Sequence, residues 1–268
     1  MKDIIPAKKE SPILGLTGMG GGVGSNIVAG LAKDTPYVDE VFSTYLYKGT
    51  QGSNTANTGL DMTKGGMVWY KSRSASNTQN LLTDTVRGAN KVLYSDADNG
   101  ENNDTGLNQT FTDTGWTLNN GYSDANSGSN TYTSWNFRKR KGFFDIVTYT
   151  GNGTARTIAH NLGSIPGCII VKKYDGSDPW YVWHRGLSDN TKTLSLNTID
   201  GEFGGQAIWN STIPTATEFS VGTSGHVNEN NKNYVAYIFA GGESTAATAR
   251  SVEFDGNTES LQLSLIHI

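Results

Sequence analysis

Four acidic residues lie close together in the polar segment 96–108 (DADNGENNDTGLN) and could supply oxygen ligands to a metal ion. They are Asp96, Asp98, Glu101 and Asp104. Carboxylate oxygens are preferred ligands of Ca²⁺, so a calcium site is one hypothesis for this segment. The four residues lack the ordered ligand spacing and the fixed glycine of a known calcium-binding loop. The default interpretation is therefore a solvated loop, with calcium as the alternative.

A second group of residues has the side chains that commonly bind sugars. Asp178, Trp180 and His184 lie within seven positions of one another. Exposed indole rings stack on sugar rings, and carboxylates accept hydrogen bonds from sugar hydroxyls. The same segment also resembles an ordinary strand whose aromatic side chains fill a core. We favour packing here and keep glycan binding as the alternative.

The glycine-rich stretch 18–25 (GMGGGVGS) resembles a phosphate-binding loop at first sight. A P-loop places a lysine directly before its serine or threonine, and Gly24 occupies that position before Ser25. No alternating strand and helix pattern follows, as a dinucleotide-binding fold would require. We predict that this stretch binds no nucleotide and belongs to an N-terminal segment that packs against partner subunits.

No other pattern in the chain marks an active site. The four histidines show no metal-ligand spacing, and no Gly-x-Ser-x-Gly motif is present. The lone Cys168 lies in an apolar run, where packing is the usual role of a free cysteine. We therefore predict no enzyme activity, no catalytic residue and no cofactor.

Charge and hydropathy exclude two classes of partner. The formal net charge is −4, which gives the molecule no general attraction to nucleic acid. No segment approaches the roughly 20 apolar residues of a membrane span, and residues 1–12 lack the apolar core of a secretory signal. We expect neither nucleic-acid binding nor membrane insertion.

The elements that would position these residues occur twice. Phe42 corresponds to Phe144 and Tyr132 to Tyr234, in both cases 102 residues apart. Apolar and turn positions recur, whereas the polar loops between them differ. A shared catalytic site would tend to repeat its polar residues, so the duplication preserved a scaffold. Arg87 and Arg185, each followed by glycine, are predicted to anchor equivalent loops.

Short runs of alternating side chains separated by glycine and asparagine are typical of strands and tight turns. The second repeat contains about eight strand candidates, near residues 143–150, 155–159, 167–173, 180–185, 192–196, 206–210, 217–222 and 233–240. Low charge content (17%) together with 33 glycines suits a turn-rich β protein. The predicted fold class is all-β, with two tandem β-sandwich (jelly-roll-like) repeats after a Gly-rich N-terminal segment.

The predicted domains are a Gly-rich attachment segment (1–40), repeat one (41–142), repeat two (143–242) and a linker with the start of a further β domain (243–268). We expect the repeats to pack end to end. Residues 263–268 (LSLIHI) match the translation of a common sequencing adapter, so we expect the parent protein to be longer. The segment 243–268 is expected to contribute nothing to the stability of the repeats.

Three phrases resemble the tail-fibre and related virion proteins of marine bacteriophages (cyanophage- or pelagiphage-like). They are SPILGLTGMGGGVGSNIVAG, VFSTYLYKG…GGMVWYKSRS…TVRG and FRKRKGFFDIVTYTGNGTARTIAHNLGSIPGCIIVKK, and together they cover about residues 11–242. In such proteins the duplicated region is a domain of unknown function, often followed by a concanavalin-like jelly roll. The resemblance supplies no catalytic residues.

This resemblance implies a non-enzymatic virion protein that contributes to recognition of the host cell surface. The implied partners are other virion proteins, further copies of the same chain (a trimer is one arrangement) and a host surface glycan or protein. The implied location is the virion. Two alternatives remain open: a polysaccharide-degrading tail enzyme and a secreted carbohydrate-binding module.

Overall fold

The computed structural model describes residues 38–241, which belong to one compact unit of the chain. These residues form antiparallel sheets with only short helical turns, so the predicted all-β fold class is confirmed. The glycine-rich stretch 18–25, the rest of the predicted attachment segment up to residue 37, and the segment 243–268 lie outside the described residues.

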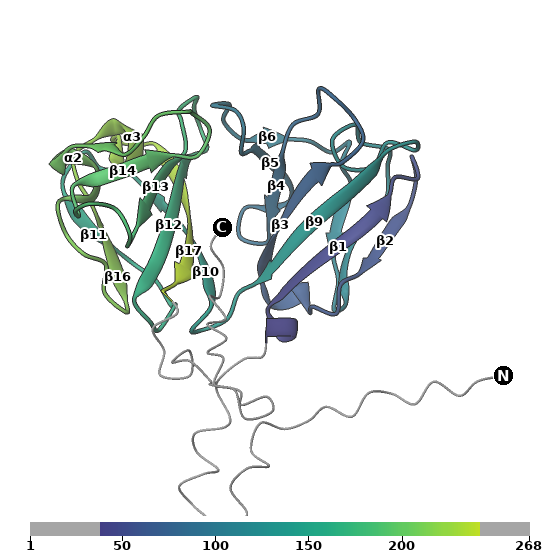
Figure 1. Ribbon diagram of the computed structural model, residues 1–268, viewed down its shortest axis with the longest axis horizontal. Helices are drawn as coiled ribbons and strands as arrows, with labels where there is room; N and C mark the ends of the chain where they lie inside the picture. Colours follow the sequence, from purple (N-terminus) through teal and green to yellow (C-terminus); the bar gives the residue numbers. More distant parts are fainter. Residues whose placement is uncertain (1–37, 242–268) are drawn as a thin grey trace, which may run out of the picture. The chain divides into compact units, whose positions relative to one another are not determined.

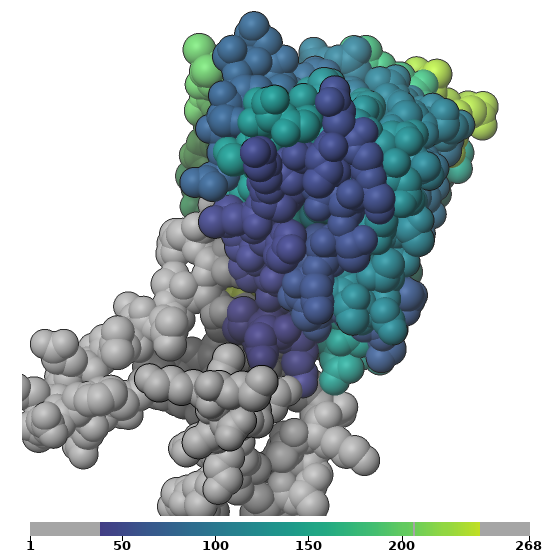
Figure 2. All heavy atoms as spheres, turned by 90° about the vertical axis from the view of Figure 1, so that its right-hand side faces the viewer, coloured from purple at the N-terminus to yellow at the C-terminus, as the bar shows by residue number. Residues whose placement is uncertain are grey.

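The first repeat contains a six-stranded sheet with the order β1-β9-β3-β4-β5-β6 and a three-stranded sheet with the order β2-β8-β7 (Figure 1). The chain passes through η1 (Val38–Glu40), β1 (Phe42–Lys48), β2 (Asn54–Asn57), η2 (Met62–Lys64), β3 (Gly66–Ser72), β4 (Leu81–Asp84), β5 (Gly88–Tyr94), β6 (Asn102–Asn103), β7 (Gln109–Phe111), β8 (Gly115–Leu118) and β9 (Thr131–Arg138). In Figure 2, purple atoms from the start of this repeat lie beside teal atoms from its later part, as the pairing of β1 with β9 requires.

The second repeat contains a six-stranded sheet with the order β10-β17-β12-β13-β14-β15 and a two-stranded sheet of β11 and β16. Its elements are β10 (Phe144–Thr150), β11 (Arg156–Ala159), β12 (Pro166–Lys173), β13 (Tyr181–His184), β14 (Lys192–Ser195), β15 (Phe203–Gly204), α2 (Gln206–Trp209), β16 (Glu218–Val221), α3 (Gly225–Asn228) and β17 (Asn233–Ala240). The two large sheets therefore have the same strand order.

Strand register shows that the residue matches drawn from the sequence are structural equivalents. Phe42 pairs with Phe137 in the first repeat, and Phe144 pairs with Phe239 at the same place in the second. Tyr132 and Tyr234 likewise pair with Tyr47 and Tyr149. A shift by one residue would turn every side chain to the other face of its sheet. The repeated apolar pattern thus fixed the register of both large sheets.

Each repeat has a core between its large and its small sheet. In the first repeat, Tyr70 of the large sheet and Trp116 of the small sheet are fully buried in one cluster. In the second repeat, Val171 and Phe219 occupy the corresponding cluster. Residues from both sheets of a repeat thus share one apolar interior, which removes their apolar surface from water.

A third apolar cluster joins the two repeats. Met67 and Phe137 of the first large sheet share it with Ile146, Val235 and Tyr237 of the second. These residues alternate along their strands with residues that face the cores within the repeats. The large sheets therefore contact each other through their outer faces, and the expected end-to-end packing is wrong. Strands buried on both faces explain why β12 and β17 read as almost continuous apolar runs.

One predicted strand of the second repeat is a helical turn. Residues 206–210 were expected to extend, but α2 occupies Gln206–Trp209 and ends at Asn210, whose φ of 54° is left-handed. Asparagine accepts this conformation more readily than most residues, and it ends the turn. The single turn buries both Ile208 and Trp209 in the core of the second repeat. Short apolar runs do not distinguish one helical turn from a strand.

A polar corner recurs inside both repeats. Asn126 is fully buried, accepts a hydrogen bond from the Thr50 amide (2.9 Å) and donates to the carbonyls of Gly52 (2.7 Å) and Asn120 (2.8 Å). Asn228 is also fully buried and repeats this pattern with the Asn152 amide (3.0 Å) and with the carbonyls of residues 154 (2.7 Å) and 222 (2.8 Å). Each asparagine satisfies backbone groups that would otherwise be buried without partners.

Tyrosine and glycine complete the same corner. The hydroxyl of Tyr132 accepts from the Ser127 amide (3.0 Å), and that of Tyr234 accepts from the Glu229 amide (2.8 Å). A Cβ atom on Gly49 would lie 2.0 Å from the Ser127 carbonyl oxygen, and one on Gly151 would lie 2.1 Å from the Glu229 carbonyl oxygen. Only glycine permits this close approach of two backbone segments.

Candidate functional site

The carboxylates of the segment 96–108 have separate protein partners. Glu101 binds Arg87 (3.1 Å) and Lys91 (3.0 Å), and Asp104 accepts from the Tyr122 hydroxyl (2.8 Å). Asp96 accepts from the Asn80 amide at 3.0 Å, and Asp98 accepts from the side chain of Asn197. Within residues 38–241, no group of three or more histidine, cysteine, aspartate or glutamate side chains could hold a metal ion. The structure thus does not bring the calcium candidates together.

Trp180 is a core residue and not an exposed sugar platform. Its side chain is fully buried, and its indole Nε1 donates to the carbonyl oxygens of Tyr94 (2.9 Å) and Ala97 (3.2 Å) of the first repeat. Its ring stacks on Tyr237, with the centroids 6.3 Å apart. The packing interpretation of Trp180 is confirmed and its assignment as a glycan-binding candidate is wrong, because the contact between the repeats covers it.

Asp178 is also occupied by protein partners. Its carboxylate is 7% exposed and lies 2.8 Å from Lys173 Nζ and 2.8 Å from His226 Nδ1. Burial opposes the charge on Lys173, but hydrogen bonds to Asp178 and Glu229 outweigh burial and raise the pKa of that ammonium group above its ordinary value. Asp178 therefore anchors the loop before β13 and offers little to a ligand.

Arg87 forms a buried network that crosses from one repeat to the other. Its guanidinium binds Asp84 (2.7 Å) and Glu101 (3.1 Å), and it donates to the hydroxyl of Tyr237 (3.1 Å) in the second repeat. The same hydroxyl donates to Asp84 at 2.8 Å. Burial raises the pKa of Tyr237 well above its ordinary value, so the phenol stays protonated and keeps this donor role.

The predicted equivalence of Arg87 and Arg185 is wrong. The amides of Thr85 and Arg185 donate to the carbonyls of Gly66 and Gly167, at 3.0 Å in each case. Arg185 therefore occupies the place of Thr85, and its side chain is exposed where that of Arg87 is buried. The matched Arg-Gly dipeptides do not share a place because their spacing departs from the offset that the strands keep.

His184, the remaining glycan candidate, lies at the start of this turn. Its Nδ1 accepts from the amide of Gly186 at 3.1 Å, as the Asp84 carboxylate accepts from the amide of Val86 at 2.9 Å. His184 is exposed and lines a pocket of about 380 Å³ at the end of β13. This volume lies within the range of ordinary small-ligand sites.

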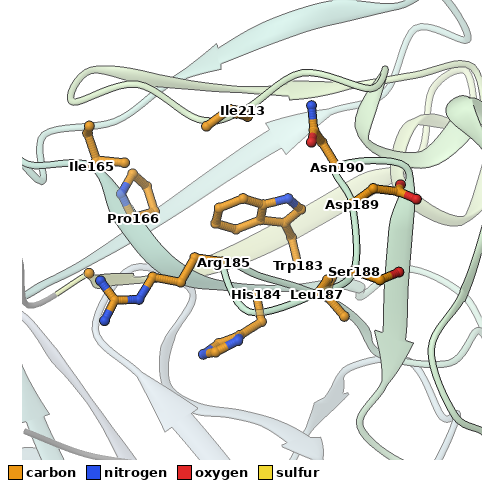
Figure 3. A pocket seen from close by; sticks show the side chains of 11 residues that line it. Ile165, Pro166, Trp183, His184, Arg185, Leu187, Ser188, Asp189, Asn190 and Ile213 are labelled. Carbon is orange, nitrogen blue, oxygen red and sulfur yellow. The ribbon is translucent and has the colours of Figure 1, made fainter. Parts of the chain in front are cut away.

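We refer to this hollow as the Trp183 pocket. The indole of Trp183 lies among its lining side chains, with Ile165 and Pro166 on one side and Asp189 and Asn190 on the other (Figure 3). Ile165 and Ile213 are 54% and 59% exposed, and Trp183 only 5%. An apolar floor with a rim of guanidinium, carboxylate and amide groups suits a small polar ligand that also has an apolar face.

Turn geometry positions the polar rim. The carboxylate of Asp189 accepts a hydrogen bond from the backbone amide of Thr191 at 2.7 Å. This bond forms a tight turn directly before β14. The side-chain amide of Asn190 donates to the carbonyl of Ser211 at 3.2 Å and so connects this turn to the loop after α2. These bonds hold both residues in place. The local sequence could not indicate this rim, because the pocket joins segments near residues 165, 185 and 213 that show no common motif.

Comparison with known proteins identifies one family. The family described as "Domain of unknown function (DUF7483)" matches residues 38–258. None of the curated proteins and none of the solved structures matches the chain. The part of the chain that the structure describes contains no helix with the length and hydrophobicity that crossing a bilayer requires.

Proposed function

The chain belongs to this family of unknown function, and on that premise we propose that it is a non-enzymatic structural protein of a phage virion. In this proposal it forms part of a tail fibre or a fibre-like appendage, with its two repeats as tandem β-sandwiches of jelly-roll type. The appendage contributes to recognition of the host cell surface, with a glycan as the expected receptor.

One observation carries the proposal. Two pairs of polar residues that recur in both repeats, Asn126 with Asn228 and Tyr132 with Tyr234, are fully buried and bind backbone groups of their own repeat. A duplicated enzyme would be expected to repeat reactive groups at a cleft. A duplicated scaffold repeats the groups that hold its backbone, and that is the pattern in this chain. The resemblance to virion proteins supplies the biological setting.

The proposal includes the place of the protein and its partners. The protein would be located in the virion, in contact with other virion proteins and with further copies of itself, and a trimer is the expected assembly. The Trp183 pocket is the proposed glycan contact within the second repeat, with His184 and Arg185 at its rim. Native mass spectrometry of the purified chain measures the assembly, and a monomer at all concentrations would contradict it.

Virion mass spectrometry tests the central claim. A phage that encodes this chain would be purified by density gradient and digested with trypsin. The peptide 142–156 (GFFDIVTYTGNGTAR) is expected among peptides of the capsid and tail, and peptides of the phage replication proteins serve as the negative control. If the peptide occurs only in the soluble fraction of the lysate, the structural role is wrong. Release of reducing ends from host polysaccharide by the purified chain would favour the enzyme alternative.

A further inference from the structure

A second pocket lies where the two repeats meet, and we refer to it as the junction pocket. Its volume is about 380 Å³. The first repeat contributes Trp69, Asn80, Ser95 and Asp96, and the second contributes the segment 196–199. Neither repeat supplies both sides of this pocket, so it depends on their contact.

Strand pairing places this pocket far from the ends of the repeats. In each repeat, the start of the first strand and the end of the last strand lie at the same end of the large sheet. There Phe42 pairs with Phe137 in the first repeat, and Phe144 pairs with Phe239 in the second. The segments that line the junction pocket follow Tyr94 and Ser195, the last residues of β5 and β14. Tyr94 and Ser195 both lie at the end of the large sheet opposite to these phenylalanine pairs. A ligand there would approach the end of the large sheets opposite to Phe42 and Phe239.

The aromatic side of the pocket is held rigidly. The indole Nε1 of Trp69 donates to Ser95 Oγ at 3.1 Å, and its ring packs edge-to-face on Trp135 with centroids 6.1 Å apart. The side chain of Trp69 is only half-buried. A fixed, partly exposed indole loses little conformational freedom when the C–H face of a sugar ring packs against it.

The polar side of the pocket offers donors and acceptors together. One carboxylate oxygen of Asp96 accepts from the Asn80 amide at 3.0 Å, and the other has no hydrogen bond within residues 38–241. The side chain of Asn80 makes no hydrogen bond to those residues either. A sugar hydroxyl both donates and accepts, so one hydroxyl can donate to Asp96 while it accepts from the Asn80 amide.

The charge of the pocket restricts the ligand further. Asp96 is the one ionisable side chain among the residues that line it. Burial raises the pKa of the Asp124 carboxyl, and the negative charge of the nearby Asp96 raises it further. This negative potential disfavours an acidic sugar. A quaternary ammonium ion would use the indole and the carboxylate but would leave the side-chain amide of Asn80 without a partner.

We propose that the junction pocket binds an uncharged sugar residue of a glycan through Trp69, Asn80 and Asp96. The proposal deepens the proposed role in host recognition and rests on it for the source of the sugar. It assigns a binding function to the contact between the repeats.

Saturation-transfer NMR on the full chain tests this assignment. The probes are the methyl glycosides of glucose, galactose, mannose and N-acetylglucosamine, with methyl sialoside and choline as charged controls. At least one neutral glycoside is expected to bind with a Kd on the order of 1 mM, which corresponds to about 4 kcal/mol. Neither charged control is expected to compete with it. Failure of all four neutral glycosides, or competition by choline or methyl sialoside, would overturn the proposal.

Matched variants locate the site. Asp96→Asn keeps an acceptor for the Asn80 amide but removes the charge, and Asn80→Ala removes the side-chain amide; each is expected to weaken binding about tenfold, or about 1.4 kcal/mol. Asp113→Asn, at an exposed carboxylate that lines neither pocket, is the control and should leave Kd unchanged, and Asp189→Asn tests the Trp183 pocket. Binding that is lost only in Asp189→Asn would assign the sugar to the other pocket and contradict the proposal. If peptide 142–156 is found in virions but the chain binds no sugar, the junction pocket proposal is wrong and the virion role still holds.

Discussion

The turn after the fourth strand has the same backbone hydrogen bond in both repeats but different side-chain surroundings. In the first repeat, Asp84 and Arg87 are buried and bind Tyr237 of the second repeat. In the second repeat, His184 and Arg185 are exposed and line the Trp183 pocket. Equivalent backbone hydrogen bonds hold both turns in place. Duplication kept the backbone of this turn, and its side chains diverged according to whether the turn meets the other repeat or faces solvent.

The largest expected difference between the two turns concerns their arginines. Arg87→Ala leaves Asp84 and Glu101 buried without their cation, which is expected to lower the free energy of unfolding by about 3–5 kcal/mol. Arg185→Ala acts at an exposed side chain and is expected to cost about 1 kcal/mol or less. Urea unfolding followed by tryptophan fluorescence measures both. Equal losses in the two variants would show that the turns carry equal energetic weight.

The asparagines of the polar corner should behave alike where the arginines differ. Asn126→Ala and Asn228→Ala each remove hydrogen bonds to several backbone groups, and each is expected to cost about 2–4 kcal/mol. Asn120→Ala is the control, because its side chain is exposed, and it should change stability by less than about 0.5 kcal/mol. A large loss in one buried asparagine and a negligible one in the other would break the equivalence.

Removal of a single oxygen atom should weaken the contact between the repeats. Tyr237→Phe removes the hydroxyl that binds Asp84 and Arg87 but keeps the ring in its apolar cluster. The expected loss is about 1–2 kcal/mol. Tyr45→Phe in the first repeat, whose hydroxyl makes no hydrogen bond within the described residues, should be nearly neutral. If both variants unfold at the same urea concentration as the parent, the network adds no stability.

The smallest expected effect depends on pH. Burial lowers the pKa of His160 below its ordinary value of 6.5, and its Nδ1 accepts from the amide of Leu162 at 3.2 Å. As pH falls below 6.5, the unfolded chain binds a proton that the folded chain resists, so this residue makes stability fall. Thr58 takes the same place in the first repeat and accepts from Leu60 at 3.3 Å. His160→Thr should therefore leave the free energy of unfolding at pH 8 unchanged. Between pH 7 and pH 5, the range in which the histidine of the unfolded chain takes up its proton, the variant should lose less stability than the parent. Thermal unfolding across this range decides, and an unchanged slope would contradict the prediction.

Local alternation and the duplication were sufficient to predict most of the fold. They located β10, β12 and β17, and the matched phenylalanines fixed the register of the large sheets. The turn at Gln206–Trp209 was missed because four residues carry too little periodicity to separate a helix from a strand.

The sites were harder to predict than the strands. Whether Trp180 fills a core or faces solvent depends on which sheet faces meet. The pattern of apolar residues within one repeat does not predict which of its faces contacts the other repeat. The junction pocket has the same origin, since Trp69 and Asn197 are far apart in sequence and come together only where the repeats touch. The pair Asn126 and Asn228 was within reach of the sequence, because an apolar residue precedes each at the same offset.

The pairing of the first and last strands of each repeat has a mechanical consequence. A pull on the two ends of a repeat acts at Phe42 and Phe137, or at Phe144 and Phe239, and these residues are direct neighbours across the antiparallel pair. Hydrogen bonds in such a pair are perpendicular to the strands, so tension applied there opens them one after another, as a zipper opens. A repeat connected in this way yields under a small load along the chain. In the proposed appendage, such a repeat would withstand drag best as a side branch, with the tension carried by other segments.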